Sequence, residues 1–249
     1  ADSLLRLAVQ AEEQRTPTDS SHLAYALNEL AVVAHDAGNL DEAESLNRRA
    51  LGIRQRTLAP MSADIGRSNN DLGLVLRDQG RFEEALPHHQ TAVAVALEVY
   101  GRESENTAAA FNGLAQAYRG AMQYARADSA FAASQAIVEA TVGREHPVYG
   151  FLGTNRGANL RLWGRPADAE PSLRSTLDLL AGTIGPGNPR TALAQLAHGD
   201  ALTDLGRHAD ALARYTAARD ALANAFGPDH WEARDATLRR AQALASLGR

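Results

Sequence analysis

The chain has 249 residues, of which 45% are hydrophobic and 22% are charged, and its formal net charge is −5. This acidic balance argues against a general nucleic-acid binder and against binding to an anionic membrane surface. Cysteine is absent, which excludes disulfides and thiolate metal sites, and no apolar run approaches the roughly 18 residues that a membrane span needs. We therefore expect a cytoplasmic protein without cofactor or metal.

A pattern of small residues repeats every 42 residues along the chain. Met122 occupies the third position of a series that is otherwise made of glycines, namely Gly38, Gly80, Gly164, Gly206 and Gly248. An alanine follows five residues after each of the first five positions, at Ala43, Ala85, Ala127, Ala169 and Ala211. A period of this size predicts an array of units that bury their apolar faces against their neighbours.

Each unit has the pattern of two helices joined by a turn at this glycine. In the first unit the predicted helices are Leu23–Ala37 and Asp41–Leu58, with apolar residues at helical spacing. The glycine caps the first helix, and acidic residues favour the start of the second. In chain order we predict the second helix of a preceding unit at 1–20, five units at 21–62, 63–104, 105–145, 146–187 and 188–229, and a final first helix at 230–249. Since the chain begins and ends inside a unit, we interpret it as a piece of a longer protein.

The order of turn glycine, apolar residue two later, alanine five later and small residue twelve later resembles the tetratricopeptide repeat (TPR). The longer period, the inter-unit loops at His146-Pro147 and Asn188-Pro189, and the segment Leu27–Ala31 resemble the kinesin-light-chain type of this repeat. The resemblance implies an all-α fold, a right-handed TPR superhelix (α-solenoid) of antiparallel helix pairs. Alanine and glycine are abundant and every basic residue is arginine, a composition typical of a GC-rich bacterium.

Three units depart from the repeat pattern. Met122 replaces a turn glycine in the third unit. Arg156-Gly157 in the fourth unit and His198-Gly199 in the fifth stand where Leu-Ala is usual. These departures weaken the pattern without breaking its period.

The resemblance also implies that the first helices of the pairs line a concave face, so that one position in each helix forms a column. Ten residues before the turn the column reads Asn28, Asn70, Asn112, Thr154, Leu196 and Leu238. Three residues before the turn it begins with His35, Arg77, Arg119 and Arg161. The predicted peptide-binding residues lie in the first four units and are Tyr25, Asn28, His35, Arg67, Asn70, Arg77, Asn112, Arg119, Asn155 and Arg161. Asparagine amides can pair with a peptide backbone, and arginines offer forked donors to carboxylates.

Each candidate also has a structural interpretation. The asparagines could bond an adjacent helix, and the arginines could pair with nearby carboxylates such as Glu29, Asp71 or Asp78. We expect Arg161 to escape such pairing, because Leu162 occupies the neighbouring position.

We expect the histidines to have structural roles and not catalytic or metal-binding ones. We expect His88-His89 to lie on a solvated helix face and His146 and His230 to have structural roles. The group formed by His198, Asp200, Asp204 and His208 is a poor candidate for metal binding or acid–base chemistry.

Taken together, the pattern predicts a non-enzymatic scaffold that binds extended or acidic segments of a protein or peptide partner in its concave groove. The alternative is a regulatory or sensor arm of a larger bacterial signalling enzyme, such as a Ser/Thr kinase, a caspase-like protease or an NTPase. A second alternative is self-association through the terminal half-units. No phosphate-binding, dinucleotide-binding or hydrolase motif is present.

Overall fold

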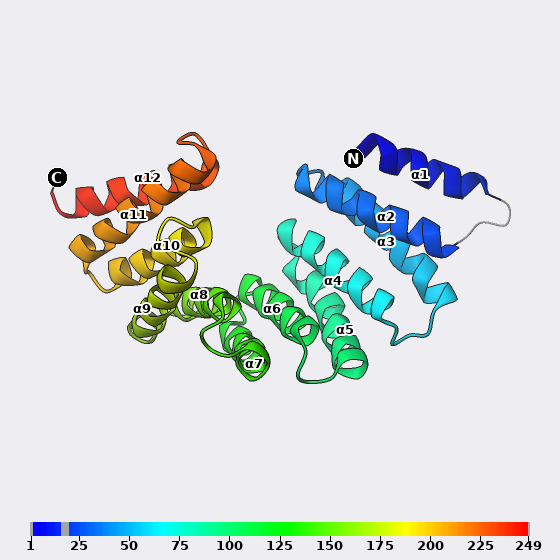
Figure 1. The fold of residues 1–249 in the computed structure, drawn as a ribbon, viewed down its shortest axis with the longest axis horizontal. Helices are drawn as coiled ribbons and strands as arrows, with labels where there is room; N and C mark the ends of the chain where they lie inside the picture. The colour runs from blue at the N-terminus through cyan, green and yellow to red at the C-terminus, as the bar shows by residue number, and fades with distance from the viewer. Residues whose placement is uncertain (1, 16–19, 249) are drawn as a thin grey trace. The chain divides into compact units, whose positions relative to one another are not determined.

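The computed structural model describes residues 2–15 and 20–248. Parts of the predicted segments 1–20 and 230–249, namely residues 1, 16–19 and 249, therefore lie outside the described residues. Within the described part the chain is built from helices and short turns (Figure 1). In chain order the helices are α1 (Asp2–Gln14), α2 (Ser20–Asp36), α3 (Leu40–Thr57), α4 (Ala63–Asp78), α5 (Phe82–Tyr100), α6 (Glu105–Gly120), α7 (Tyr124–Val142), α8 (Pro147–Leu162), α9 (Pro166–Thr183), α10 (Pro189–Asp204), α11 (His208–Phe226) and α12 (Trp231–Ser246).

The helices form two compact units, one ending at Gln123 and the other beginning at Tyr124. In unit 1, α2 packs on α3 and α4 on α5, and α5 also contacts α6. In unit 2, α8 packs on α9 and α10 on α11, and α11 also contacts α12. The alanines that follow the turns by five residues are fully buried, at Ala43, Ala85, Ala127, Ala169 and Ala211. Small side chains at these positions allow neighbouring helices to approach closely.

The turn inside each pair uses the left-handed backbone conformation. At Gly80, φ is +78°, the backbone N–H of Gly80 donates to the carbonyl of Arg77, and that of Arg81 donates to the carbonyl of Leu76 at 2.9 Å. This arrangement closes the end of a helix with bonds to its last carbonyls. Met122 adopts the same conformation with φ of +57°, so the third turn keeps its geometry without glycine.

Polar side chains cap the start of the first helix in several pairs. Ser62, Ser104, His146 and Asn188 each accept a hydrogen bond from a backbone N–H in the first turn that follows. Such a cap satisfies one of the free donors at a helix N-terminus. The expected structural role of His146 is thus confirmed, because its Nδ1 accepts the N–H of Val148 at 3.3 Å.

The helical glycines that depart from the repeat pattern make room for a large partner. A Cβ atom at Gly157 would lie 2.4 Å from Cγ of Leu173, and one at Gly199 would lie 2.5 Å from Cε1 of Tyr215. The same relation holds for Gly73, where a Cβ atom would lie 2.8 Å from Nε2 of His89. In each pair a glycine on the first helix faces a bulky residue nine positions after the turn glycine on the second helix.

Candidate functional site

The predicted binding residues lie on the first helices of their pairs, and each compact unit carries its own set. In unit 1, α2 carries Tyr25, Asn28 and His35, α4 carries Arg67, Asn70 and Arg77, and α6 carries Asn112 and Arg119. In unit 2, α8 carries Asn155 and Arg161. Tyr25 is exposed, whereas Asn112 and Asn155 are partly buried and each interacts within the chain.

Asn28 is buried, so the prediction that its amide faces a ligand is wrong. Its side chain is 1% exposed, its Nδ2 donates to Asp71 at 2.8 Å, and its Oδ1 accepts from Arg54 at 2.7 Å. Arg54 is itself buried and also donates to Ser68 Oγ. Burial lowers the pKa of the Arg54 guanidinium, and this polar network joins α2, α3 and α4.

A chain of polar contacts crosses the first helices of unit 1. His35 on α2 contacts Asp78 on α4, with Nε2 2.8 Å from Oδ2. Arg77 donates to the same carboxylate at 2.8 and 2.9 Å, and its Nη1 donates to Gln116 on α6 at 3.1 Å. Asp78 is therefore shared between His35 and Arg77.

The positive charge of Arg77 influences the pKa of Arg119 on a neighbouring helix. Helices α4 and α6 are in contact, and the side chain of Arg119 on α6 is partly buried. Burial, and then the charge of Arg77, lower the pKa of Arg119. Two partly buried guanidinium groups on adjacent helices are forked donors of the kind that bind anionic groups.

A groove of about 230 Å³ in unit 1 is lined by residues of α4, α5 and α6. Among the described residues, none bonds the side-chain amide of Asn70. Arg67, Asn70, Tyr100 and Asn106 supply the polar part of the lining. The rest of the lining comes from small or apolar residues of α4, α5 and α6, namely Ala63, Gly66, Ala92, Val95, Ala96, Ala109 and Ala110. The groove thus combines an apolar floor with a few polar groups, as peptide and small-ligand sites do.

The floor of this groove was not predicted from the sequence, although a signal for it exists. Ala96 stands sixteen residues after Gly80, and Arg54 stands sixteen residues after Gly38. At the earlier position the Arg54 side chain reaches from α3 to Asn28 on α2 and Ser68 on α4. The small Ala96 leaves the corresponding space open, so comparing this one position among the units would have located the groove.

His89 is buried, contrary to the expectation that His88-His89 lies on a solvated face. Its side chain is 1% exposed and lies next to Gly73 on α4 and Gly113 on α6. Burial is the main cause that lowers the pKa of His89 to about 4, which keeps the imidazole neutral near pH 7.

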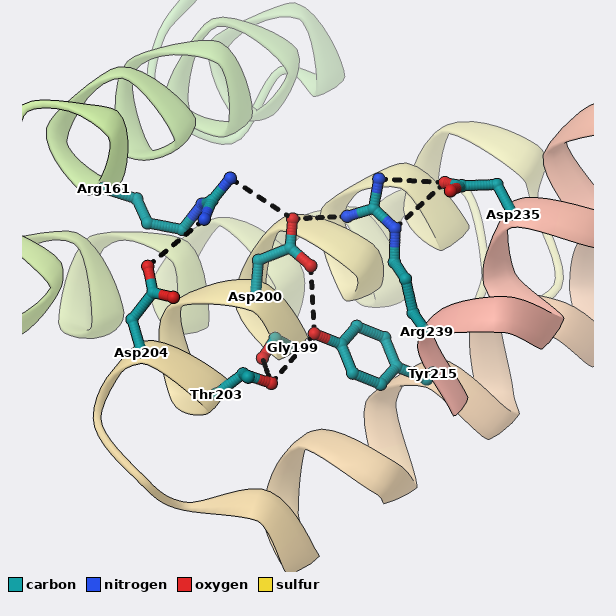
Figure 2. Close-up of polar contacts among 8 residues, drawn as sticks. All are labelled: Arg161, Gly199, Asp200, Thr203, Asp204, Tyr215, Asp235 and Arg239. Atoms are coloured by element: carbon teal, nitrogen blue, oxygen red, sulfur yellow. Dashed lines mark hydrogen bonds and ion pairs between the residues drawn. The ribbon is translucent and has the colours of Figure 1, made fainter. Parts of the chain in front are cut away.

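Arg161 in unit 2 is paired, so the expectation that it escapes pairing is wrong. Its Nη1 donates to Asp204 at 3.2 Å, and its Nη2 lies 3.7 Å from Asp200. Figure 2 shows Asp200 on α10 between Arg161 on α8 and Arg239 on α12. The hydroxyl of Tyr215 donates to the same carboxylate at 2.9 Å. This network pairs Arg161 and Arg239 within the chain. The same structural interpretation is confirmed for Arg67, which donates to Glu29 at 3.1 Å.

Two other features are absent from the described part of the chain. None of the described helices is both long and apolar enough to cross a membrane. In the same part of the chain, no three His, Cys, Asp or Glu side chains gather closely enough to hold a metal ion.

Comparison with known proteins identifies a repeat family in part of the chain. The tetratricopeptide-repeat family matches residues 23–60 and residues 64–132. No curated protein is similar enough in sequence to count as a match.

Several solved structures share the fold. The kinesin light chain TPR-like repeats of Podosopora anserina are 22% identical, with a TM-score of 0.70 over 83% of this chain and 98% of that one. BtubC from P. vanneervenii is 19% identical, with a TM-score of 0.72 over 91% of both chains. A Rap protein in complex with Competence and Sporulation Factor is 15% identical, with a TM-score of 0.61 over 99% of this chain and 72% of that one. The predicted all-α solenoid of antiparallel helix pairs is thus confirmed. Tetratricopeptide repeats match residues 23–60 and 64–132, and the fold is similar to that of kinesin light chain TPR-like repeats.

Proposed function

We propose that the protein is a non-enzymatic scaffold that binds an extended, acidic segment of a partner protein along the first helices of unit 1. The observation that carries this proposal is the pair of partly buried guanidinium groups of Arg77 and Arg119 on adjacent helices. Asp78 is already shared between Arg77 and His35. A ligand carboxylate could accept forked hydrogen bonds from these guanidinium groups.

The groove in unit 1 supports the same function. It lies between α4 and α6 and includes the amide of Asn70, which can donate to and accept from a peptide backbone. One of the similar structures is a Rap protein in complex with Competence and Sporulation Factor, so this fold accommodates a bound factor in at least one protein.

A binding measurement tests the proposal. Fluorescence anisotropy would be followed for a set of labelled extended peptides, acidic or neutral in matched pairs, at low and high salt. We expect acidic peptides to bind more tightly at low salt, because salt screens exposed charges. In the double variant Arg77→Gln/Arg119→Gln, we expect affinity to fall about tenfold or more, equivalent to about 1.4 kcal/mol.

The matched control is Arg48→Gln. Arg48 is an exposed arginine of α3 that pairs with Glu44 on its own helix at 2.8 Å. This variant removes a positive charge without touching the candidate site, so its affinity should stay within twofold of the original. Equal affinity of the double variant and the original protein at low salt would reject the proposal.

Self-association is a second candidate, favoured by exposed apolar side chains on two helices. Leu4 and Leu7 of α1 are 72% and 60% exposed, and Trp231 and Leu238 of α12 are 69% and 58% exposed. Exposed apolar residues on one helix face favour contact with another surface. Sedimentation velocity over a hundredfold concentration range decides this candidate, since a constant monomer mass would exclude it.

A further inference from the structure

We propose that copies of this chain join head to tail, with α12 of one copy packed against α1 of another as the two helices of one repeat pair. This inference rests on self-association, the second candidate function, and it names the surfaces that meet. Helix α12 precedes the turn glycine Gly248, as first helices do. Ala8 of α1 stands one period of 42 residues before Ala50 of α3, which is a second helix.

Three contacts between α8 and α9 show which positions of a first helix face its second helix. In each contact, a Cβ atom on a glycine of α8 would lie 2.4–2.7 Å from a side-chain atom of α9. The three pairs are Gly157 with Leu173, Gly153 with Thr176, and Gly150 with Leu180. Counted from Gly164, they join positions 7, 11 and 14 before the turn to positions 9, 12 and 16 after it.

Helix α12 exposes the face that a second helix covers elsewhere in the chain. Counted from Gly248, its residues at the three positions are Ala241, Thr237 and Arg234, and all three are exposed. In α2, α4, α8 and α10 the residues at these positions are buried, and each of these helices packs on the second helix of its pair. Helix α12 packs on α11 through a different face.

Helix α1 exposes the face that a first helix covers elsewhere. Its residues at the three positions of a second helix are Leu5, Ala8 and Glu12. The corresponding residues of α3 are all buried, namely Asn47, Ala50 and Arg54. In α1, by contrast, Ala8 is exposed. The neighbouring Leu4 is 72% exposed, whereas its counterpart Leu46 on α3 is 7% exposed.

Joining the two faces places side chains of complementary size opposite each other. Ala241 would face Leu5, in the way that a glycine of α8 faces a leucine of α9. Thr237 would face the small Ala8. Such alternation of small and large residues allows two helices to pack closely.

The third contact of the joint pairs opposite charges, Arg234 with Glu12. The other first helices have alanine or glycine at the position of Arg234, namely Ala24, Gly66, Ala108, Gly150 and Ala192. Four of the second helices have an apolar residue at the position of Glu12, namely Ala96, Val138, Leu180 and Leu222. A cation on α12 and a carboxylate on α1 therefore stand at positions that meet within a pair, where they can form a charge-assisted hydrogen bond.

Both charged groups can make this contact. Within residues 2–15 and 20–248, no side chain pairs with the guanidinium of Arg234. Glu12 accepts a hydrogen bond from Arg15 on its own helix at 3.0 Å, and its side chain is 18% exposed. Since a carboxylate has two oxygens that accept several hydrogen bonds, Glu12 can bind Arg234 and keep its contact with Arg15.

Charge reversal tests the joint. The full chain and the single variants Glu12→Arg and Arg234→Glu would be compared by sedimentation velocity at low salt over a range of concentrations. The joint uses different surfaces on the two copies, so association builds chains or rings and the average mass rises with concentration. Each single variant sets like charges against each other, so we expect its association constant to fall by about tenfold or more.

An equimolar mixture of the two variants gives an independent readout. Every joint between unlike chains in this mixture pairs opposite charges again, so association should return to within about threefold of the original. The matched control is Glu98→Arg, which makes the same charge change at an exposed position of α5 in unit 1. This variant should associate within twofold of the original chain.

The outcomes separate this inference from the function on which it rests. Association that persists in both single variants, or that stays lost in their mixture, would overturn the joint between α12 and α1 and leave self-association in place. A constant monomer mass of the original chain at every concentration would reject self-association itself, and the joint with it.

Discussion

Met122 illustrates the free-energy cost of a non-glycine residue at a turn that requires the left-handed backbone conformation. The other described turns of this kind have glycine, and Met122 adopts φ of +57° in its place while its side chain is 73% exposed. A non-glycine residue in this region costs about 1–2 kcal/mol, and the exposed side chain gains little packing in return.

We therefore expect Met122→Gly to raise the free energy of unfolding by about 1 kcal/mol. The gain is partly offset because glycine adds freedom to the unfolded chain. Urea denaturation followed by circular dichroism measures the change. The reciprocal variant, Gly80→Met at φ of +78°, should lose a comparable amount, and a neutral or destabilising Met122→Gly would contradict the prediction.

Two asparagines show which features of the candidate site could not be predicted from the sequence. Asn28 and Asn70 occupy the same position of the repeat, yet Asn28 is buried and Asn70 lines a groove. The difference lies in their surroundings, because Arg54 fills one space and Ala96 leaves the other open. A column of identical residues predicts a shared face of the helix, but which member is accessible depends on side chains from another helix.

At the scale of the helix, the sequence was a reliable guide. The predicted helices Leu23–Ala37 and Asp41–Leu58 correspond to α2 and α3, with ends that differ by up to three residues. Glycine turns and the apolar period specify these ends locally. Ion pairs between helices were harder to assign, since Arg161 reaches Asp204 on a helix that begins 28 residues further along the chain.

The contact between Gly73 and His89 makes a prediction about helix packing. Alanine is the better helix former by about 1 kcal/mol, but a Cβ atom at residue 73 would lie 2.8–3.0 Å from three atoms of the His89 ring. We expect Gly73→Ala to lower the free energy of unfolding by about 1–3 kcal/mol, because the buried ring must move.

Gly52→Ala is the matched control for this substitution. Gly52 lies inside α3 of the same unit, and its added Cβ atom would be 3.6 Å from the nearest atom, the Nη1 of Arg56. This control should gain up to about 1 kcal/mol from helix propensity. Chemical denaturation of both variants decides the matter, and a stabilising Gly73→Ala would show that the ring is not held as described.

At the scale of the whole chain, two buried histidines make stability depend on pH. The pKa of His89 is about 4 in the folded protein, whereas an unfolded histidine titrates near 6.5. Burial also lowers the pKa of His198, despite its contact with Glu170. Below pH 6.5 the unfolded chain binds protons that the folded protein does not, so stability falls as the pH drops from about 6.5 toward 4.

For His89 alone we expect a loss of about 3 kcal/mol over this interval. Denaturation curves at pH 7, 6 and 5 would show the decline, and His89→Leu should reduce its slope. Leucine is a reasonable replacement, because Leu173 occupies the corresponding position beside Gly157. A variant with the same pH dependence as the original chain would show that His89 is not the residue responsible.

The paired glycines and bulky residues also constrain how such a gene can change. In α4, α8 and α10 a glycine faces His89, Leu173 or Tyr215, whereas the corresponding residues of α2 and α3 are Ala31 and Asn47. A crossover that joined α2 to α11 would set an alanine methyl group against the ring of Tyr215, and the reverse exchange would leave a void beside Gly199. Helices from different repeats are therefore not interchangeable. Successful recombination between repeats would have to transfer both helices of a pair together.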